Sequence, residues 1–250
     1  MDSRFLAAAL EKNAGKVGGR LSAYLQNPDD GESVHDVRTS LRRLEAAFSL
    51  MPKKARRKNR AQIKAYKEFF RANSRVRDYD VIREKLEGAA AGLEKKRKVE
   101  LLRALRLARA VQELPALDTR INNDKLDARV DRVASRLLSS IKKRLPAALA
   151  DREEKEELHE LRKDLKKLRY VLEILPAGSR KDYEIKLAGL IKARGPVTAR
   201  LKELQDLTGS IHDCDIAIDY LKSVRKAGAI LQKQMAERDG LFDKFARMFS

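Results

Sequence analysis

The sequence predicts an all-α protein. Its apolar residues recur at spacings of three and four rather than two, which is the period of a helix with one buried face. Leu, Ala, Lys, Arg and Glu are abundant, and β-branched residues rarely cluster. Segments rich in proline, glycine or asparagine divide the chain into stretches of helical length. These three observations favour helices packed into bundles.

Four helices are expected in the first half, separated by turn-forming residues. NPDDG at 27–31 and Pro52 end the first two helices, and LPALDTRINND at 114–124 follows the last. A break near Gly88 or Gly92 is expected within the longest stretch. The expected helices cover residues 3–26, 33–51, 54–75 and 77–112.

Six helices are expected in the second half. Pro176, followed by Ala-Gly-Ser, ends the second of them, and Gly195 precedes Pro196, which suits the first turn of a helix. The expected helices cover residues 126–149, 152–175, 181–194, 197–208, 211–227 and 228–248.

The start of the expected helix 33–51 carries a capping signal. Ser33 is followed three residues later by Asp36, as in a capping box. This structural role for Asp36 argues against treating the neighbouring His35 as half of a metal-binding His-Asp pair.

Composition limits the classes of function. The 250 residues are 43% hydrophobic, enough for a buried core, and their formal net charge is +19. Such self-repulsion predicts a polyanionic partner: nucleic acid, a phosphate polymer or an acidic membrane surface. The single cysteine, Cys214, excludes an intramolecular disulfide. The N-terminus is a poor signal peptide and no stretch suits a membrane span, so we expect a soluble cytoplasmic protein.

One segment of the sequence occurs twice. VHDVRTSLRRLEAAFSLMP at 34–52 aligns without a gap on LHELRKDLKKLRYVLEILP at 158–176. Leucine recurs easily by chance. The joint repetition of a histidine, several basic positions and a proline does not. The matched positions include His35 with His159, Arg38 with Arg162, Arg42 with Lys166 and Pro52 with Pro176.

A second segment follows each copy. FFRANSRVRDYDVIREKL at 69–86 matches LQDLTGSIHDCDIAIDYL at 204–221. The chain is therefore interpreted as a duplicated helical unit, with internal repeats at approximately 1–115 and 125–250 and a hinge at 114–124. We interpret the aspartates of this segment as structural partners of nearby arginines, with metal binding as the alternative. They are Asp78, Asp80, Asp213 and Asp215.

The repeated histidine helix has two distinct faces. Its apolar stripe is expected in the core, and a basic stripe lies beside it, whereas Glu160 and Asp164 are expected on the opposite polar edge, away from the bases. A solvated helix face normally mixes both signs of charge. The apolar stripes are Val34, Val37, Leu41, Leu44 and Phe48, then Leu158, Leu161, Leu165, Leu168 and Leu172.

The next helix in the first half carries a further basic ridge, formed by Arg60, Lys64, Lys67, Arg71 and Arg75. The second half keeps Lys202 at the position of Lys67 but has Ala199 and Asp206 where the ridge would continue. A merely solvated basic face remains the alternative for this ridge.

These segments resemble the repeated motifs of the CHAD family, the conserved histidine α-helical domains. The resemblance covers nearly the whole chain, as a single CHAD domain, and His159 to Glu173 is its most specific part. It implies two four-helix bundles related by pseudo-two-fold symmetry, with inorganic polyphosphate bound by basic residues that line a cavity between them. Many relatives carry an adjacent triphosphatase domain of the CYTH type. This chain leaves no room for one, so binding without hydrolysis is expected, as is association with polyphosphate granules.

The expected polyphosphate-binding residues come from both repeats. Arg77 and His212 share the position before the paired aspartates, and the first repeat is expected to contribute less affinity because Thr39 and Glu45 replace Lys163 and Arg169. The set is His35, Arg38, Arg42, Arg43, Lys64, Lys67, Arg77, His159, Arg162, Lys163, Lys166, Arg169, Lys202 and His212.

Two other functions stay open. Nucleic-acid binding is the main alternative, because a phosphate backbone attracts any basic surface, although the absence of Trp and the scarcity of aromatics in the stripes leave little for base stacking. A metal-dependent phosphohydrolase is the weaker alternative, suggested by His35-Asp36 and His212-Asp213. Only three histidines exist, and two share one repeat position, so no catalytic residue, metal or cofactor is expected. The sequence does not identify a protein partner.

Overall fold

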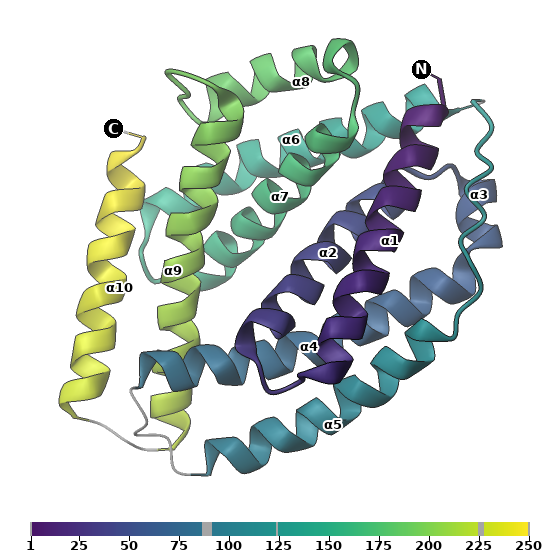
Figure 1. Cartoon of the computed structure of the whole chain (residues 1–250). Coiled ribbons are helices and arrows are strands. Elements are labelled where there is room, and N and C mark those ends of the chain that lie inside the picture. Colours follow the sequence, from purple (N-terminus) through teal and green to yellow (C-terminus); the bar gives the residue numbers. More distant parts are fainter. Residues whose placement is uncertain (1, 87–91, 124, 225–227, 250) are drawn as a thin grey trace. The chain divides into compact units, whose positions relative to one another are not determined.

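The computed structural model describes residues 2–86, 92–123, 125–224 and 228–249. Within these ranges the chain forms ten helices and no strand, which confirms the predicted all-α class (Figure 1). None of the helices in these ranges has the length and apolar character needed to cross a membrane.

The helices belong to two compact units. Unit 1 contains Met1–Asp80, Ala90–Val133 and Ile174–Pro176, and unit 2 contains Val81–Ala89, Ala134–Glu173 and Ala177–Ser250. In unit 1, α1 packs on α2 and α5, and in unit 2, α9 packs on α8 and α10. The helices are α1 (Arg4–Gln26), α2 (Gly31–Leu50), α3 (Lys53–Lys58), α4 (Arg60–Lys85), α5 (Leu93–Gln112), α6 (Leu126–Ala150), α7 (Lys155–Ile174), α8 (Ala177–Leu190), α9 (Val197–Ser223) and α10 (Ala229–Arg247). The cavity between bundles and their pseudo-two-fold symmetry stay predictions.

Two expected helix breaks are wrong. The chain continues as one helix through residue 76 in α4, since no proline or glycine occurs between Arg60 and Lys85. It also continues through Gly209 in α9, because the helix accommodates a single glycine at a modest cost. The possible break at Gly88 lies outside the described residues. Gly92 precedes α5 with a φ of 81°, a left-handed conformation that glycine adopts readily.

The capping prediction for α2 is also wrong. Asp30, not Ser33, caps this helix, and its carboxylate accepts hydrogen bonds from the backbone N–H groups of Glu32 (3.1 Å) and Ser33 (3.0 Å). Asp36 instead forms an ion pair with Arg20 of α1. The side chain of Asp36 therefore has a structural partner, as the sequence suggested, but a different one.

The apolar stripes of the repeated helix are buried as predicted. All five apolar residues of the stripe in α2 and all five in α7 lie in the core. Burial of each such leucine contributes roughly 1.5–3 kcal/mol to the stability of the folded state. This burial fixes the rotation of each helix about its axis, and thereby fixes the direction of the adjacent basic stripe.

A buried ion pair holds the start of α2 in unit 1. Nε of Arg97, on α5, donates to Oδ1 of Asp80, on α4, at 2.7 Å, and the two side chains are 4% and 0% exposed. The same guanidinium donates from Nη1 to Oδ1 of Asp29 at 2.9 Å and from Nη2 to the Asp29 carbonyl at 3.4 Å. Arg97 thus joins α4 and α5 to the loop from which the histidine helix begins.

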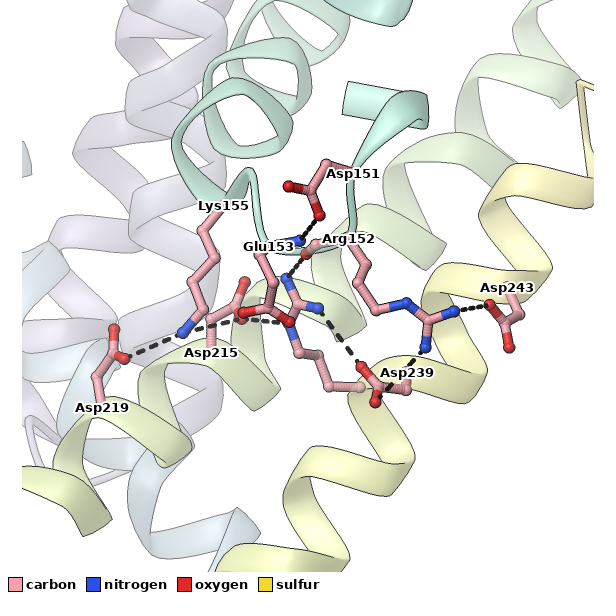
Figure 2. Close-up of polar contacts among 9 residues, drawn as sticks. Asp151, Arg152, Glu153, Lys155, Asp215, Asp219, Asp239 and Asp243 are labelled. Carbon is pink, nitrogen blue, oxygen red and sulfur yellow. Dashed lines mark hydrogen bonds and ion pairs between the residues drawn. The ribbon is translucent and has the colours of Figure 1, made fainter. Parts of the chain in front are cut away.

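Unit 2 contains the equivalent arrangement. Nε of Arg238, on α10, donates to Oδ1 of Asp215, on α9, at 2.7 Å, and Nη2 donates to the Arg152 carbonyl in the loop before α7. Figure 2 shows this loop fixed on both sides: Arg152 pairs with Asp239 and Asp243, and Lys155 lies between Asp215 and Asp219. Asp80 and Asp215 therefore have the structural role that the repeat suggested.

The segment between the sequence repeats is anchored to unit 1. The side-chain amide of Asn59, which is fully buried, donates to the Asp118 carbonyl at 3.0 Å and accepts from the Asp118 N–H at 2.9 Å. Lys58 and Arg120 pair with the Asp118 carboxylate, and these bonds hold its pKa well below the usual range. The segment expected to be a hinge is thus bonded to α3 and its C-cap.

Loss of the buried carboxylate in unit 1 should strongly destabilise the protein. Asp80→Asn keeps the shape of the side chain but removes the buried carboxylate, so Arg97 retains only the exposed carboxylate of Asp29, and the free energy of unfolding should fall by about 3–5 kcal/mol. Asp29→Asn is the matched control, because Asp29 bonds to the same arginine but its side chain is 80% exposed, so about 1 kcal/mol or less is expected. Urea unfolding measures both. Equal effects would contradict the structural role of the buried pair.

Candidate functional site

The two histidines of unit 2 meet between α7 and α9. Nδ1 of His159 lies 3.3 Å from Nδ1 of His212, and the ring centroids are 4.6 Å apart. A hydrogen bond at this distance needs one protonated and one unprotonated nitrogen, and two imidazolium rings would repel each other. The structure therefore brings together two predicted site residues that are far apart in the sequence.

Arg162 and Lys202 extend this surface along α9. A Cβ on Gly209 would lie 3.8 Å from Nη2 of Arg162, so the guanidinium lies directly against the glycine. Lys202, exposed, shares the face of α9 that carries Gly209 and His212. Arg162 itself is 8% exposed, so it is more buried than the predicted surface stripe implied.

Two further basic residues of α7 are partly neutralised, and Lys166 on the same helix is half-buried. Lys163 pairs with Glu160, and Nε of Arg169 lies 3.1 Å from Oε1 of Glu173. The prediction that Glu160 lies away from the bases is therefore wrong, because a residue three positions before a lysine faces the same side of a helix. The prediction holds for Asp164, which accepts from Ser140 of α6 at 2.6 Å.

Unit 1 builds a related surface on α2. The Arg38 and Arg42 guanidinium carbons lie 5.9 and 5.5 Å from the centroid of the Phe70 ring on α4. Such cation–π contacts hold the planar groups in place while leaving their charge intact. Arg77 lies close enough to His35 to disfavour its protonation. The residue before the paired aspartates thus lies near the repeated histidine position in each unit.

The other predicted site residues of unit 1 lie elsewhere on the helices. Arg43 follows Arg42 and is half-buried, one step around α2 from the basic stripe. Lys64 and Lys67 are exposed on α4, and Nζ of Lys64 lies 3.9 Å from Oε1 of Glu68. They share a face with the exposed Arg60, Arg71 and Arg75, whereas Phe70 points to an adjacent face.

Two site histidines resist protonation. Although much of the His35 side chain reaches the surface, desolvation lowers its pKa, and the positive charges of Arg77 and Arg38 add to the effect. Desolvation also lowers the pKa of His159, followed by the charges of Lys163 and Arg162. Both rings are therefore mainly neutral near pH 7, and an anion brought beside them would favour their charged form.

The chemistry of the site suits anion binding. Arginine offers a planar fork for phosphate oxygens, lysine a mobile point charge, and histidine a donor whose charge rises near anions. The part of the chain that the structure describes contains no group of three or more His, Cys, Asp or Glu side chains placed to hold a metal ion. Cys214 is buried, and burial raises the pKa of its thiol.

Sequence reasoning missed two contributors to these surfaces. Phe70 supports Arg38 and Arg42, but its aromatic ring is replaced by Gln205 in the second repeat, so the repeat did not point to it. Gly209 allows Arg162 to approach α9, and its position inside a helical pattern was the available signal.

Comparison with known proteins agrees with this architecture. A search of curated proteins found no match. Among solved structures, the crystal structure of the CHAD domain from the plant Ricinus communis is similar to this chain, with a TM-score of 0.54 and 17% sequence identity. The similarity covers 98% of this chain and 90% of that one, which shows a shared fold.

The family model for the CHAD domain matches residues 8–222, and this range includes both histidine helices, the Arg97–Asp80 pair and Asp215 of the second buried pair. With most of its length matched, the chain belongs to the CHAD domain family.

Proposed function

We propose that this protein binds inorganic polyphosphate through the basic surfaces of both repeats and does not cleave it. The observation that carries the proposal is the group formed by His159, His212 and Arg162 on one face of α7 and α9. In unit 1, His35, Arg38 and Arg77 occupy the positions of the repeat that His159, Arg162 and His212 occupy in unit 2. Family membership supports the same ligand, because the CHAD family is associated with polyphosphate.

The local charge balance favours a long polymer over a single phosphate. Lys163 and Arg169 each have an acidic partner on α7, so single sites on this helix are only moderately attractive to anions. A chain of phosphates can contact many such cations at once, and each further contact then adds binding energy at little extra entropic cost. The formal charge of +19 favours the same class of ligand over long range.

The arrangement of the residues supports binding without hydrolysis. Cleavage of a phosphoanhydride bond needs a positioned nucleophile or a metal-activated water. The histidines here face each other or an arginine, and the buried aspartates Asp80 and Asp215 are engaged by Arg97 and Arg238. We therefore propose a recruiting role at polyphosphate granules within the cytoplasm. Protein that stayed diffuse in cells with visible granules would contradict this role.

Neutralising three lysines of the histidine surface should weaken polyphosphate binding, and of these Lys163 and Lys202 are exposed whereas Lys166 is half-buried. Lys163→Gln/Lys166→Gln/Lys202→Gln removes charge beside the histidine pair without disturbing buried Arg162. At near-physiological salt, where non-specific attraction is screened, we expect the Kd for long-chain polyphosphate to rise at least tenfold. Isothermal titration calorimetry measures the change, with duplex DNA and single-stranded RNA as competing ligands.

The matched control is Lys142→Gln/Lys143→Gln/Lys181→Gln. These lysines are exposed residues of unit 2, and their replacement removes the same charge away from the site. The control should bind nearly as the unmodified protein does. Equal losses in both variants, or displacement of polyphosphate by nucleic acid, would mean that net charge rather than a shaped surface governs binding.

Polyphosphate affinity should rise as the pH falls from 8 to 6. The pKa values of His35 and His159 are lowered in the free protein, and a bound polyanion raises them, so binding takes up protons. Without ligand the sign is opposite: protonation favours the unfolded state, and stability is lost as the pH falls below about 6.5. Titrations in buffers of different ionisation enthalpy report the proton uptake directly. His35→Gln/His159→Gln should lose most of this uptake, and an unchanged value would exclude these rings from the binding surface.

A further inference from the structure

Unit 2 contains a second basic site on another side of α9. A pocket of about 550 Å³ lies where the α8–α9 loop, the first turns of α9 and the end of α10 meet. Its volume falls in the range of small-molecule sites, but its lining is strongly cationic. The lining residues are Lys192, Arg194, Gly195, Pro196, Ala199, Arg200, Glu203, Lys244, Arg247 and Met248.

Arg200 builds the pocket. Its Nε donates to the Ile191 carbonyl at 3.2 Å, and its Nη2 donates to the Met248 carbonyl. Its Nη1 donates to Glu203 at 2.9 Å, and its guanidinium carbon lies 5.9 Å from the centroid of the Phe249 ring. The arginine therefore ties the ends of α8 and α10 to α9, and it neutralises the acidic residue of the lining.

Four other cations remain for a ligand. Lys192, Arg194, Lys244 and Arg247 are all exposed, and Lys192 donates to the Phe249 carbonyl. Within the described ranges, Arg194, Lys244 and Arg247 form no ion pair. Four positive charges that converge on one hollow repel each other, so an anion bound there would relieve an unfavourable arrangement.

Two backbone features add to the same field. α9 begins at this pocket with Pro196 as its N-cap, and the positive end of the helix dipole favours an anion there. Lys192 adopts a φ of 47°, a left-handed conformation that glycine adopts at lower cost. The chain therefore has a positive charge at the rim of the pocket at a position where glycine would give less backbone strain.

The pocket is separate from the histidine surface. Arg200 precedes His212 by twelve residues, which is about 18 Å along a helix. Arg200 and Glu203 also point to a different side of α9 from Gly209 and His212. In the register that pairs Lys202 with Lys67, Arg200 is opposite Ala65, so the first repeat lacks the residue that builds the pocket.

We infer that this pocket binds a compact group of about three linked phosphates. Its cations match the charge of a triphosphate, and guanidinium forks suit phosphate oxygens. A small number of phosphates fits a pocket of this size, whereas a long chain suits an extended stripe. The group can come from a soluble oligophosphate or from the end of a long polyphosphate chain, and the two sources share the same chemistry. The second source rests on the proposed function, and the first does not.

The test uses inorganic tripolyphosphate and the full chain at near-physiological salt. The pocket variant is Arg194→Gln/Lys244→Gln/Arg247→Gln, made in the background of Lys163→Gln/Lys166→Gln/Lys202→Gln so that residual binding reports the pocket. We expect the pocket substitutions to raise the residual Kd for tripolyphosphate at least tenfold, as measured by calorimetry. An unchanged Kd would overturn the inference, whatever long-chain polyphosphate does at the histidine surface.

Long-chain polyphosphate distinguishes the two sources. If chain ends enter the pocket, the pocket substitutions alone should weaken the binding of short chains more than that of long chains at equal phosphate concentration, because short chains present more ends. If the ligand is a soluble oligophosphate, only tripolyphosphate binding should change. Both results support the pocket. If Lys163→Gln/Lys166→Gln/Lys202→Gln bound long-chain polyphosphate as tightly as the unmodified protein does, this result would contradict the proposed function but not the pocket.

Lys192→Gly is a second variant of the pocket, chosen because it is expected to fold. Glycine adopts the left-handed conformation at lower cost, which offsets the lost hydrogen bond from Lys192 to the Phe249 carbonyl, so this variant should be about as stable as the unmodified protein while removing one pocket cation. Its tripolyphosphate affinity should fall about threefold or more, and the thermal shift on adding ligand should shrink accordingly. A stable Lys192→Gly protein with unchanged affinity would count against the pocket.

Discussion

A buried arginine–aspartate pair is the constraint on which each half of this protein depends. Arg97 with Asp80, and Arg238 with Asp215, remove two opposite charges from water, which is tolerable only when both partners stay together in good geometry. Each arginine also bonds to a backbone carbonyl in the loop before a histidine helix. The pair thus sets where that helix begins, and burial of the apolar stripe sets its rotation. The basic surface has its direction because of these two constraints, neither of which involves a residue proposed to touch the ligand.

Much of the fold could be predicted from periodicity and duplication, because both depend on local sequence. The apolar stripes of α2 and α7 are buried as expected, since a period of 3.6 leaves a helix only one way to face a core. The misplaced breaks in α4 and α9 fall inside the repeated segments 69–86 and 204–221, where no turn-forming residue or only a single glycine interrupts the helical pattern. The cap of α2 was misassigned because Asp30 and Ser33 both have capping side chains, and only the path of the preceding loop decides between them.

The candidate site was predictable as a set of residue types but not as a set of contacts. The repeat identified His159 and His212 separately, and only the packing of α7 on α9 shows that their rings meet. The burial of Arg162 depends on Gly209, which removes a side chain from another helix. The pairing of Lys163 with Glu160 is local and could have been anticipated from their spacing.

The pocket around Arg200 has no counterpart in the first repeat, so a search guided by repetition passes over it. Its walls come from three segments that only tertiary structure brings together.

The boundaries of the two units do not coincide with those of the predicted repeats. Residues 81–89 belong to unit 2, although they directly follow the first segment of unit 1. Residues 90–133 belong to unit 1 again. Arg129, in the first turns of α6, donates to the Ser49 carbonyl at 2.8 Å, so unit 1 uses a residue from beyond the segment that separates the repeats. A fragment that ended between the predicted repeats, near residue 115, would therefore lack residues 116–133 of unit 1 and would carry residues 81–89 without the rest of unit 2.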